Sequence, residues 1–274
     1  MATPFIFPSI TSLPAGYDCA ISIPTARILS KTRQDGVIEC RMRVFCEGEV
    51  RYEHEFHIER RNGRFDLDRV DFNWPNQSEQ WGKSAGFLEI GFRSADDLPL
   101  FRNFRVIPFY AIYSMPGKKS FFSDSAFRYG SPPIINQIAR FGRYVDTYPV
   151  VHLNRERDLG ETLALINPYE KAILSTIETQ DGRKIKRRRV EPNSVLNVRL
   201  SELLEPDEAE WRGQIQLHAT NRLVTFHIKH SFRDPTIISD HEHLDPFRSD
   251  ETHYPITQLA RLRFGEFLKA RGWI

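Results

Sequence analysis

The sequence predicts a mainly β fold of two antiparallel β-sandwich-like modules, joined by a short linker helix and followed by a C-terminal helix. Three observations support this prediction. Apolar and polar residues alternate with a period of two through most of the chain, turn-forming residues separate the alternating segments at short intervals, and two stretches have the apolar spacing of an amphipathic helix. The 40% hydrophobic content and the 20 Phe residues can fill a substantial core.

Residues 1–115 are expected to form the N-terminal β module. Its candidate strands are residues 17–31, 36–46, 49–60, 64–72, 86–93 and 103–115. The clearest is RYEHEFHIER, in which Tyr52, His54 and Phe56 share one parity and mostly charged residues share the other. This alternation is typical of an antiparallel strand with one buried face.

A segment rich in turn-forming residues, 116–146, is expected to join the modules and to contain a short helix. Ser131 suits the N-cap and Pro132 suits the first helical position. The apolar stripe consists of Ile134, Ile135, Ile138 and Phe141. Gly142 then ends the predicted helix.

Residues 147–232 are expected to form the second module. The candidate strands are residues 150–154, 161–166, 171–179, 184–190, 194–203, 213–220 and 223–231. Asn167-Pro168 and Asp181-Gly182 are among the turn signals between them. Seven short strands at nearly even spacing predict an antiparallel sandwich.

A two-residue turn at Asn221 and Arg222 is expected to pair the last two of these strands as a hairpin. In that register one face pairs only apolar residues, namely Ile215/Ile228, Leu217/Phe226 and Ala219/Val224. The other face pairs only polar residues, namely Gln214/Lys229, Gln216/His227 and His218/Thr225. Because a shift by one residue would mix the two faces, the pattern favours this hairpin.

The turns and strands of this module also come in a distinctive order. An Asn-Pro turn is followed by a long strand, an Asp-Gly turn, a return strand, a turn containing Pro192 and the segment VLNVRLSELL. In this order residues 147–232 resemble immunoglobulin-like sandwich modules. The buried Trp and the cysteine pair of true immunoglobulin domains are missing. The resemblance implies an architecture and no activity.

Residues 233–274 are expected to form a His- and Asp-rich loop followed by the C-terminal helix. Pro255 begins the predicted helix, which continues to Arg271. Its apolar stripe consists of Ile256, Ala260, Phe264, Phe267 and Leu268.

Composition bears on location and partners. The net charge of +2, from 38 basic and 36 acidic residues, argues against nucleic acid as the main partner. No run approaches the roughly 20 apolar residues of a membrane span. The N-terminal segment lacks the basic start of a signal peptide, so a cytoplasmic location is expected. Three cysteines are an odd number, which excludes a full disulfide framework. Cys40 and Cys46 lie too far apart on one candidate strand to form a bridge, so these two are predicted to be free thiols.

The densest group of potential metal ligands lies in the predicted loop. His241 and His243 project to the same side of an extended chain, and Asp245 or His253 could complete a set of three ligands. Zinc, iron or manganese would suit such ligands. A structural or partner-facing loop is the alternative, since loops before helices often use such residues for capping.

The polar face of the predicted hairpin is a second candidate. Gln214, Gln216, His218 and His227, together with Thr225 and Lys229, would form a face suited to binding a sugar or a polar partner. The alternatives are an ordinary solvated face or a surface against which the N-terminal module docks.

A third candidate is the basic run of residues 184–189, KIKRRR. Its position between two turns predicts an exposed edge strand, on which charge blocks unwanted strand pairing. The alternative is a patch that binds phosphate or nucleic acid.

The leading hypothesis is a non-catalytic binding or scaffolding protein that presents β-sandwich surfaces to a protein or glycan partner and needs no cofactor. It rests on the sandwich pattern and on the lack of specific catalytic motifs. The alternative is a metal-dependent enzyme with its divalent metal bound by the residue 240–253 cluster. Homo-oligomerisation through the C-terminal helix or the edge strands is a further hypothesis.

Overall fold

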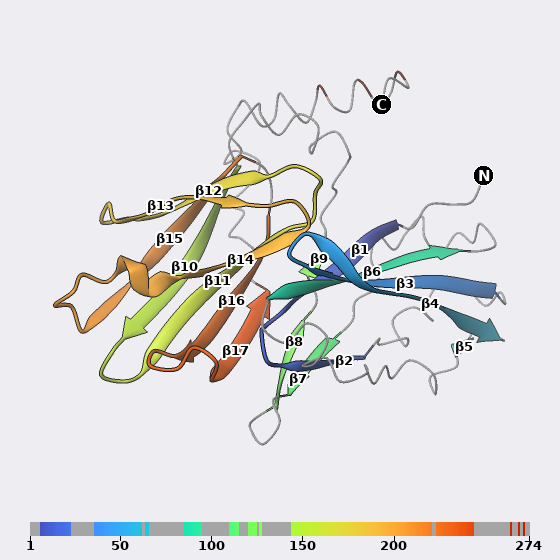
Figure 1. Ribbon diagram of the computed structural model, residues 1–274, viewed down its shortest axis with the longest axis horizontal. Helices are drawn as coiled ribbons and strands as arrows, with labels where there is room; N and C mark the ends of the chain where they lie inside the picture. Colours follow the sequence, from blue (N-terminus) through green and yellow to red (C-terminus); the bar gives the residue numbers. More distant parts are fainter. Residues whose placement is uncertain are drawn as a thin grey trace. The chain divides into compact units, whose positions relative to one another are not determined.

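The computed structural model describes residues 6–22, 36–61, 64–65, 85–94, 110–114, 120–124, 126–127, 144–220 and 223–243, together with Phe264, Leu268 and Arg271. These residues form a mainly β protein with several antiparallel sheets, which confirms the predicted class (Figure 1). The chain divides into two compact units, Met1–Tyr129 and Gly130–Ile274. The boundary between the units lies within residues 116–146.

Unit 1 contains two antiparallel sheets. A six-stranded sheet has the order β5-β4-β3-β6-β1-β9, and a three-stranded sheet has the order β2-β7-β8. The strands of the larger sheet are β1 (Ile6–Leu13), β3 (Gly36–Cys46), β4 (Glu49–Arg61), β5 (Arg64–Phe65), β6 (Gly86–Ser94) and β9 (Ala126–Phe127). Those of the smaller sheet are β2 (Asp18–Ser22), β7 (Tyr110–Ser114) and β8 (Ser120–Asp124).

The alternation predicted for RYEHEFHIER is confirmed in β4. Met42 and Val44 of β3 are buried and lie in register with His54 and Tyr52 of β4, which are half-buried. The intervening residues of β4 from Arg51 to Glu59 are exposed. Unit 1 therefore builds this part of its core from one face of the β3–β4 pair.

A buried tyrosine connects the two sheets of unit 1. The Tyr113 hydroxyl on β7 donates to the Ser12 carbonyl of β1 over 2.6 Å, and Thr11 Oγ1 lies 2.6 Å from the same hydroxyl. Because Tyr113 donates to Ser12, the Thr11 hydroxyl is the donor in the second contact. The polar end of this large buried side chain is thus satisfied.

Cys40 and Cys46 are buried free thiols, as expected from their spacing, and Cys19 is a buried free thiol as well. Desolvation raises the pKa of all three thiols, because burial disfavours the thiolate. The cysteines are therefore apolar core residues in their ordinary thiol form.

Unit 2 is built on one eight-stranded sheet with the order β13-β12-β15-β10-β11-β16-β17, in which β14 pairs with β11. The strands are β10 (Tyr144–Asn154), β11 (Leu159–Asn167), β12 (Ile173–Thr179), β13 (Lys184–Val190), β14 (Ser194–Arg199), β15 (Glu210–Ala219), β16 (Val224–Ser231) and β17 (Ile238–His243). A short 3-10 helix, η3 (Leu200–Leu203), follows β14.

The sheet of unit 2 divides between β10 and β11. These strands pair only at Asn154 and Leu159, next to the turn that joins them. Farther along, residues 162–167 of β11 pair with β14 instead. Two runs result, β13-β12-β15-β10 and β14-β11-β16-β17, which meet at the β10–β11 turn.

One buried apolar cluster draws on both runs and on η3. The first run contributes Val151, Leu153, Ile173, Ile177, Ile185, Val190, Trp211, Ile215, Leu217 and Ala219. The second run and η3 contribute Leu163, Leu165, Val198, Leu200 and Leu203. In β12 every second residue of Ile173–Thr179 is buried, so alternation along this strand directs Ile173 and Ile177 into the cluster.

The predicted hairpin of the strands on either side of Asn221 and Arg222 is wrong. β15 pairs with β10 and β12, whereas β16 pairs with β11 and β17. The apolar face predicted for β15 is confirmed, but Thr225 and His227 of β16 are buried too. Alternation identified the apolar face of β15 correctly, but it identified neither the second buried face of β16 nor the neighbouring strand, because β16 belongs to the other run.

The His-rich segment also differs from the prediction. Residues 238–243 form strand β17 beside β16, so the segment is not a connector outside the sheets. The predicted linker helix lies outside the described residues, as do the part of the predicted loop after His243 and most of the predicted C-terminal helix. Phe264 and Leu268 are helical, and Phe264 is 52% exposed although it was expected in the apolar stripe. Within the described part of the chain, no helix has the length and apolarity to cross a bilayer.

Candidate functional site

His241 and His243 lie on one face of β17, against the ring of Phe226 on β16. The ring centroids of His241 and Phe226 are 4.8 Å apart, and those of His243 and Phe226 are 5.7 Å apart. His241 is fully buried, and desolvation lowers its pKa to about 3. Its imidazole is therefore neutral near pH 7 and packs as a flat core side chain.

The other predicted ligands, Asp245 and His253, lie outside the described residues. Where side chains are described, no group of three or more His, Cys, Asp or Glu residues is arranged to hold a metal ion. Metal binding by His241 and His243 stays a prediction.

His230, at the end of β16, is held on both of its nitrogens. Its Nδ1 donates to the Ser231 carbonyl over 2.9 Å, so Nε2 accepts from the Thr162 hydroxyl at 2.8 Å. Burial lowers the pKa of this imidazole. Gly160 makes the close approach possible, because a Cβ there would lie 2.7 Å from Cε1 of His230. His230 therefore joins β16 to β11.

His227 forms a buried pair with Glu161 of β11. His227 Nε2 donates to Glu161 Oε2 over 2.5 Å, and the two side chains are 4% and 6% exposed. Glu161 Oε1 accepts the backbone N–H of His152 on β10 at 2.9 Å. His227 is thus inside unit 2, and its predicted place on an exposed ligand-binding face is wrong because β16 does not pair with β15.

The remaining predicted ligand-binding residues do share one face of β15. Gln216 is exposed, while Gln214 and His218 are half-buried. Their parity is opposite to that of the buried Ile215 and Leu217. The structure therefore keeps Gln214, Gln216 and His218 together and separates them from His227 by β10 and β11.

The neighbouring strand β12 completes this face with residues that the sequence analysis did not single out. Thr176 and Glu178 lie in register with His218 and Gln216, and Gln180 Nε2 donates to Gln214 Oε1 over 2.5 Å. Glu178 Oε2 lies 3.5 Å from His218 Nε2. We call these six residues the polar ladder: Thr176, Glu178, Gln180, Gln214, Gln216 and His218. The alternation in ILSTIET could have indicated from the sequence that Thr176 and Glu178 share a face opposite to the buried residues.

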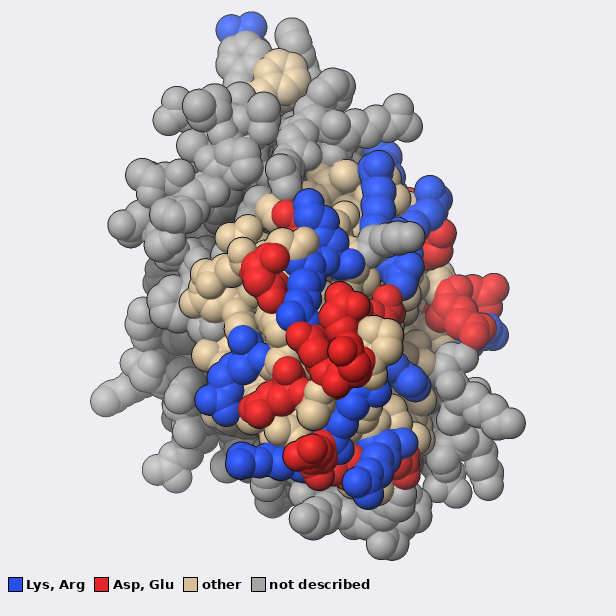
Figure 2. Space-filling view, turned by 90° about the vertical axis from the view of Figure 1, so that its left-hand side faces the viewer, with Lys and Arg blue, Asp and Glu red and all other residues tan. Residues whose placement is uncertain are grey.

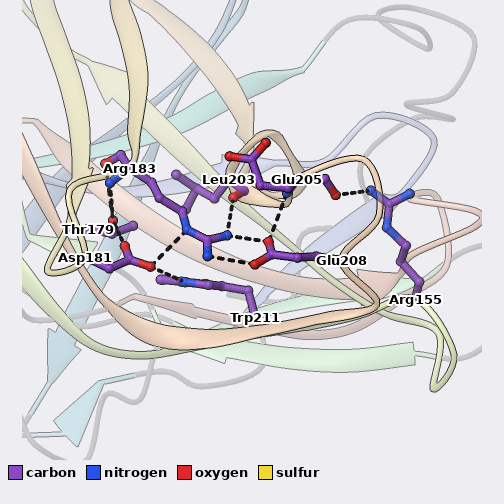
Figure 3. A network of polar contacts seen from close by, with 8 residues as sticks. All are labelled: Arg155, Thr179, Asp181, Arg183, Leu203, Glu205, Glu208 and Trp211. Carbon is purple, nitrogen blue, oxygen red and sulfur yellow. Dashed lines mark hydrogen bonds and ion pairs between the residues drawn. The ribbon is translucent and has the colours of Figure 1, made fainter.

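Arg183, in the turn between β12 and β13, is the centre of the network in Figure 3. Its guanidinium donates to both carboxylate oxygens of Glu208, with Nη2 to Oε1 at 2.8 Å, and Nη1 also donates to the Leu203 carbonyl at 3.0 Å. Nε donates to Asp181 Oδ2 at 2.9 Å, and Trp211 Nε1 donates to the same oxygen at 3.2 Å.

These bonds affect both acids. Hydrogen bonding from Arg183 lowers the pKa of Glu208, and the Thr179 hydroxyl is the largest cause of the lowered pKa of Asp181. The network joins the β12–β13 turn to Leu203 and to the segment after η3, so these charged groups stabilise the packing of the turn against that segment.

The basic run lies on β13, which is at one end of the order of the described strands, in agreement with the predicted edge strand. Lys184, Arg188 and Arg189 pair with Glu178, Glu202 and Glu191 at 3.1, 2.7 and 2.6 Å. Figure 2 shows basic and acidic side chains interspersed over the described face. Lys184, Arg188 and Arg189 of β13 thus each lie beside a carboxylate.

Comparisons with known proteins add no assignment. No protein-family model matches the chain, and neither a curated protein nor a solved structure matches it.

Proposed function

We propose that the chain is a non-catalytic binding or scaffolding protein that presents sheet surfaces to a protein or glycan partner. The observation that carries the proposal is the polar ladder. Five of its side chains lie on β12 and β15, on the face opposite to the buried apolar cluster, and Gln180 in the turn after β12 bonds to Gln214. Amides and hydroxyls both donate and accept hydrogen bonds, which suits sugar hydroxyls and peptide groups alike.

The use of the other polar groups in unit 2 supports a non-catalytic role. Glu161 and His227 bond to each other, His230 bonds to Thr162, and Arg183 bonds to Glu208. Each of these contacts joins one strand or turn to another. Groups engaged in this way hold the ladder on a rigid support, as a preorganised binding surface requires.

Within this proposal, unit 2 is an immunoglobulin-like sandwich. Support comes from the two runs of strands that share one buried cluster. One feature differs from the usual connectivity, since β10 lies beside β15 and β16 lies beside β11. The first and last long strands of the module have in effect exchanged sheets.

The test uses the full chain on an array of immobilised glycans, and a photo-crosslinking residue at position 216 to capture protein partners. We expect glycan signal or a discrete crosslinked partner, and we expect Gln216→Arg to abolish it. Asn197→Arg is the matched control, because Asn197 is an exposed polar residue on β14. If the chain gives no glycan signal and no crosslinked partner at position 216, the proposal is contradicted.

Elemental analysis tests the metal-dependent alternative on the same preparation. Zinc, iron or manganese bound in stoichiometric amount, and lost from the His243→Ala variant, would contradict a non-catalytic role. His243 is the suitable position, since it is half-buried and its replacement disturbs the core less than that of His241.

A further inference from the structure

The polar ladder differs in composition from the charged outward face of β4. On that face Arg51, Glu53, Glu55 and Glu59 are exposed, with the exposed His57 among them. Charged side chains of this kind are usual on a face that only has to stay solvated. The ladder instead consists of three amides, one hydroxyl, one imidazole and one carboxylate, without Lys or Arg. Its composition therefore indicates more than solvation.

The ladder side chains hold one another in place across the β12–β15 pair. Gln180 Nε2 donates to Gln214 Oε1 over 2.5 Å, and Glu178 Oε2 lies 3.5 Å from His218 Nε2. Gln214 and His218 are also half-buried. Side chains that are already ordered lose little conformational entropy when a ligand binds, so the ladder is preorganised.

The charges on and around the ladder are balanced. The carboxylate of Glu178 lies 3.1 Å from Lys184 Nζ of β13 through its other oxygen. Farther along the same face of β15, the bond to His152 and the charge of Arg212 lower the pKa of Glu210. Because electrostatic complementarity selects partners of opposite charge, a balanced face favours an uncharged ligand.

The ladder also lacks the apolar centre of a protein interface, where buried aromatic and aliphatic anchors supply most of the binding energy. The large apolar residues of β12 and β15, such as Ile177 and Leu217, point to the opposite face and into the core. On the ladder side of these two strands Leu174 is the one apolar residue, and it is half-buried. Sugar hydroxyls, which both donate and accept, match the amides and the hydroxyl of the ladder.

The shape of the ladder bears on the form of the ligand. It consists of three rows, each with one residue of β12 or its following turn and one residue of β15. Residues on one face repeat every ~6.7 Å along a strand, and neighbouring strands lie ~4.8 Å apart, so the ladder is a strip about 13 Å long and one strand spacing wide. A narrow, flat strip suits an extended chain better than a coiled one.

We propose that the polar ladder binds an uncharged, extended, β-linked oligosaccharide that lies along β12 and β15. The sugar hydroxyls exchange hydrogen bonds with the amides of Gln180, Gln214 and Gln216 and with the hydroxyl of Thr176. This inference rests on the proposed function and names the ligand of that same surface.

Three sugar probes separate charge from shape. Cellohexaose is uncharged and extended, maltohexaose is uncharged and coils, and hexagalacturonate is anionic. Each is titrated onto the isotope-labelled full chain, and binding is followed by NMR through the side-chain amide signals of the glutamines. Replacement of each glutamine in turn assigns these signals.

The variant Gln216→Ala removes one amide of the ladder. Gln216 is exposed, so the fold should tolerate the change, and an unaltered urea midpoint verifies this. The matched control is Asn197→Ala, which removes an exposed amide from β14.

We expect cellohexaose to shift the amide signals of Gln180, Gln214 and Gln216, and to bind more tightly than the other two probes. Its affinity for Gln216→Ala should be about tenfold lower than for the control, as the loss of two hydrogen bonds implies. Equal binding of all three probes, or an equal loss in the control, would overturn the inference.

The outcomes also separate this inference from the proposed function. A protein crosslinked at position 216, or signal from charged glycans alone, would overturn the assignment of an uncharged sugar and leave a binding role standing. Absence of sugar binding and of any crosslinked partner would overturn both.

Discussion

Glu161 and His227 lie on neighbouring strands of unit 2, with 2.5 Å between Oε2 and Nε2. Glu161 follows Leu159, the residue at which β10 and β11 pair, by only two positions. Its second oxygen accepts the backbone N–H of His152 on β10. One buried carboxylate therefore holds β10 and β16 together where the sheet divides.

Replacing Glu161 by Gln is expected to lower the free energy of unfolding by about 2–4 kcal/mol. The amide NH2 takes the place of one of the two accepting oxygens, so one buried N–H faces another donor. Urea denaturation followed by circular dichroism measures the loss. Glu210→Gln is the control, since Glu210 also bonds to His152 but its side chain is 50% exposed. Equal destabilisation by both variants would contradict the role assigned to Glu161.

Replacing Arg183 by Lys should loosen the segment after η3. An ammonium group cannot donate to both oxygens of Glu208 and also to Asp181 and the Leu203 carbonyl. Hydrogen exchange at residues 204–209 is expected to become severalfold faster, while that of β16 stays unchanged. Arg189→Lys provides the comparison, because its pair with Glu191 is on the surface, with both side chains more than half exposed.

Replacing His241 by Phe should reduce the acid sensitivity of unit 2. Burial lowers the pKa of His241 from 6.5 to about 3, so between these values the unfolded chain binds a proton that the folded chain does not. Stability therefore falls as the pH drops below 6.5, by up to about 1.4 kcal/mol per pH unit from this residue.

Phe at position 241 keeps the packing against Phe226 and removes the titrating group. Urea midpoints measured from pH 7.5 to pH 4.5 test this expectation. His230, whose pKa burial also lowers, contributes in the same direction and stays in the variant as an internal reference. A variant with the wild-type slope would show that His241 does not titrate as described.

Replacing Gly160 by Ala is expected to destabilise unit 2 by about 1–3 kcal/mol through overpacking. The added methyl would lie 2.7 Å from Cε1 and 2.8 Å from Nδ1 of His230, which must then leave Thr162. A double-mutant cycle with His230→Ser gives the measurement. If the imidazole is the obstacle, the second change removes most of the penalty of the first; additive losses would point to another cause.

The sequence predicted which face of β4 and β15 is buried, but it did not predict which strands pair with each other. The parity of Tyr52 and His54 on β4, and of Ile215 and Leu217 on β15, follows directly from alternation, since one buried face is enough to produce it. Alternation contains no information on which strand lies alongside. The plausible register across Asn221 and Arg222 therefore led to a hairpin that does not form.

The candidate site was affected by the same limit. His227 was expected beside Gln216, but it belongs to a strand that is buried on both faces, and its partner Glu161 is far away in the sequence. Conversely, Thr176 and Glu178 joined the polar ladder because β12 lies beside β15. His241 was expected in a loop, because the polar sequence DHEH is typical of a connector. It is instead a core residue, because β17 pairs with β16 and the imidazole packs against Phe226.

The buried thiols offer a practical consequence. All three cysteines of the chain, Cys19, Cys40 and Cys46, belong to unit 1, and unit 2 contains none. The rate at which a thiol reagent modifies the native protein therefore reports exposure of thiols that all lie in unit 1. A cysteine introduced on the surface of unit 2 would react first, which gives a single attachment point for a dye without any change to the natural residues.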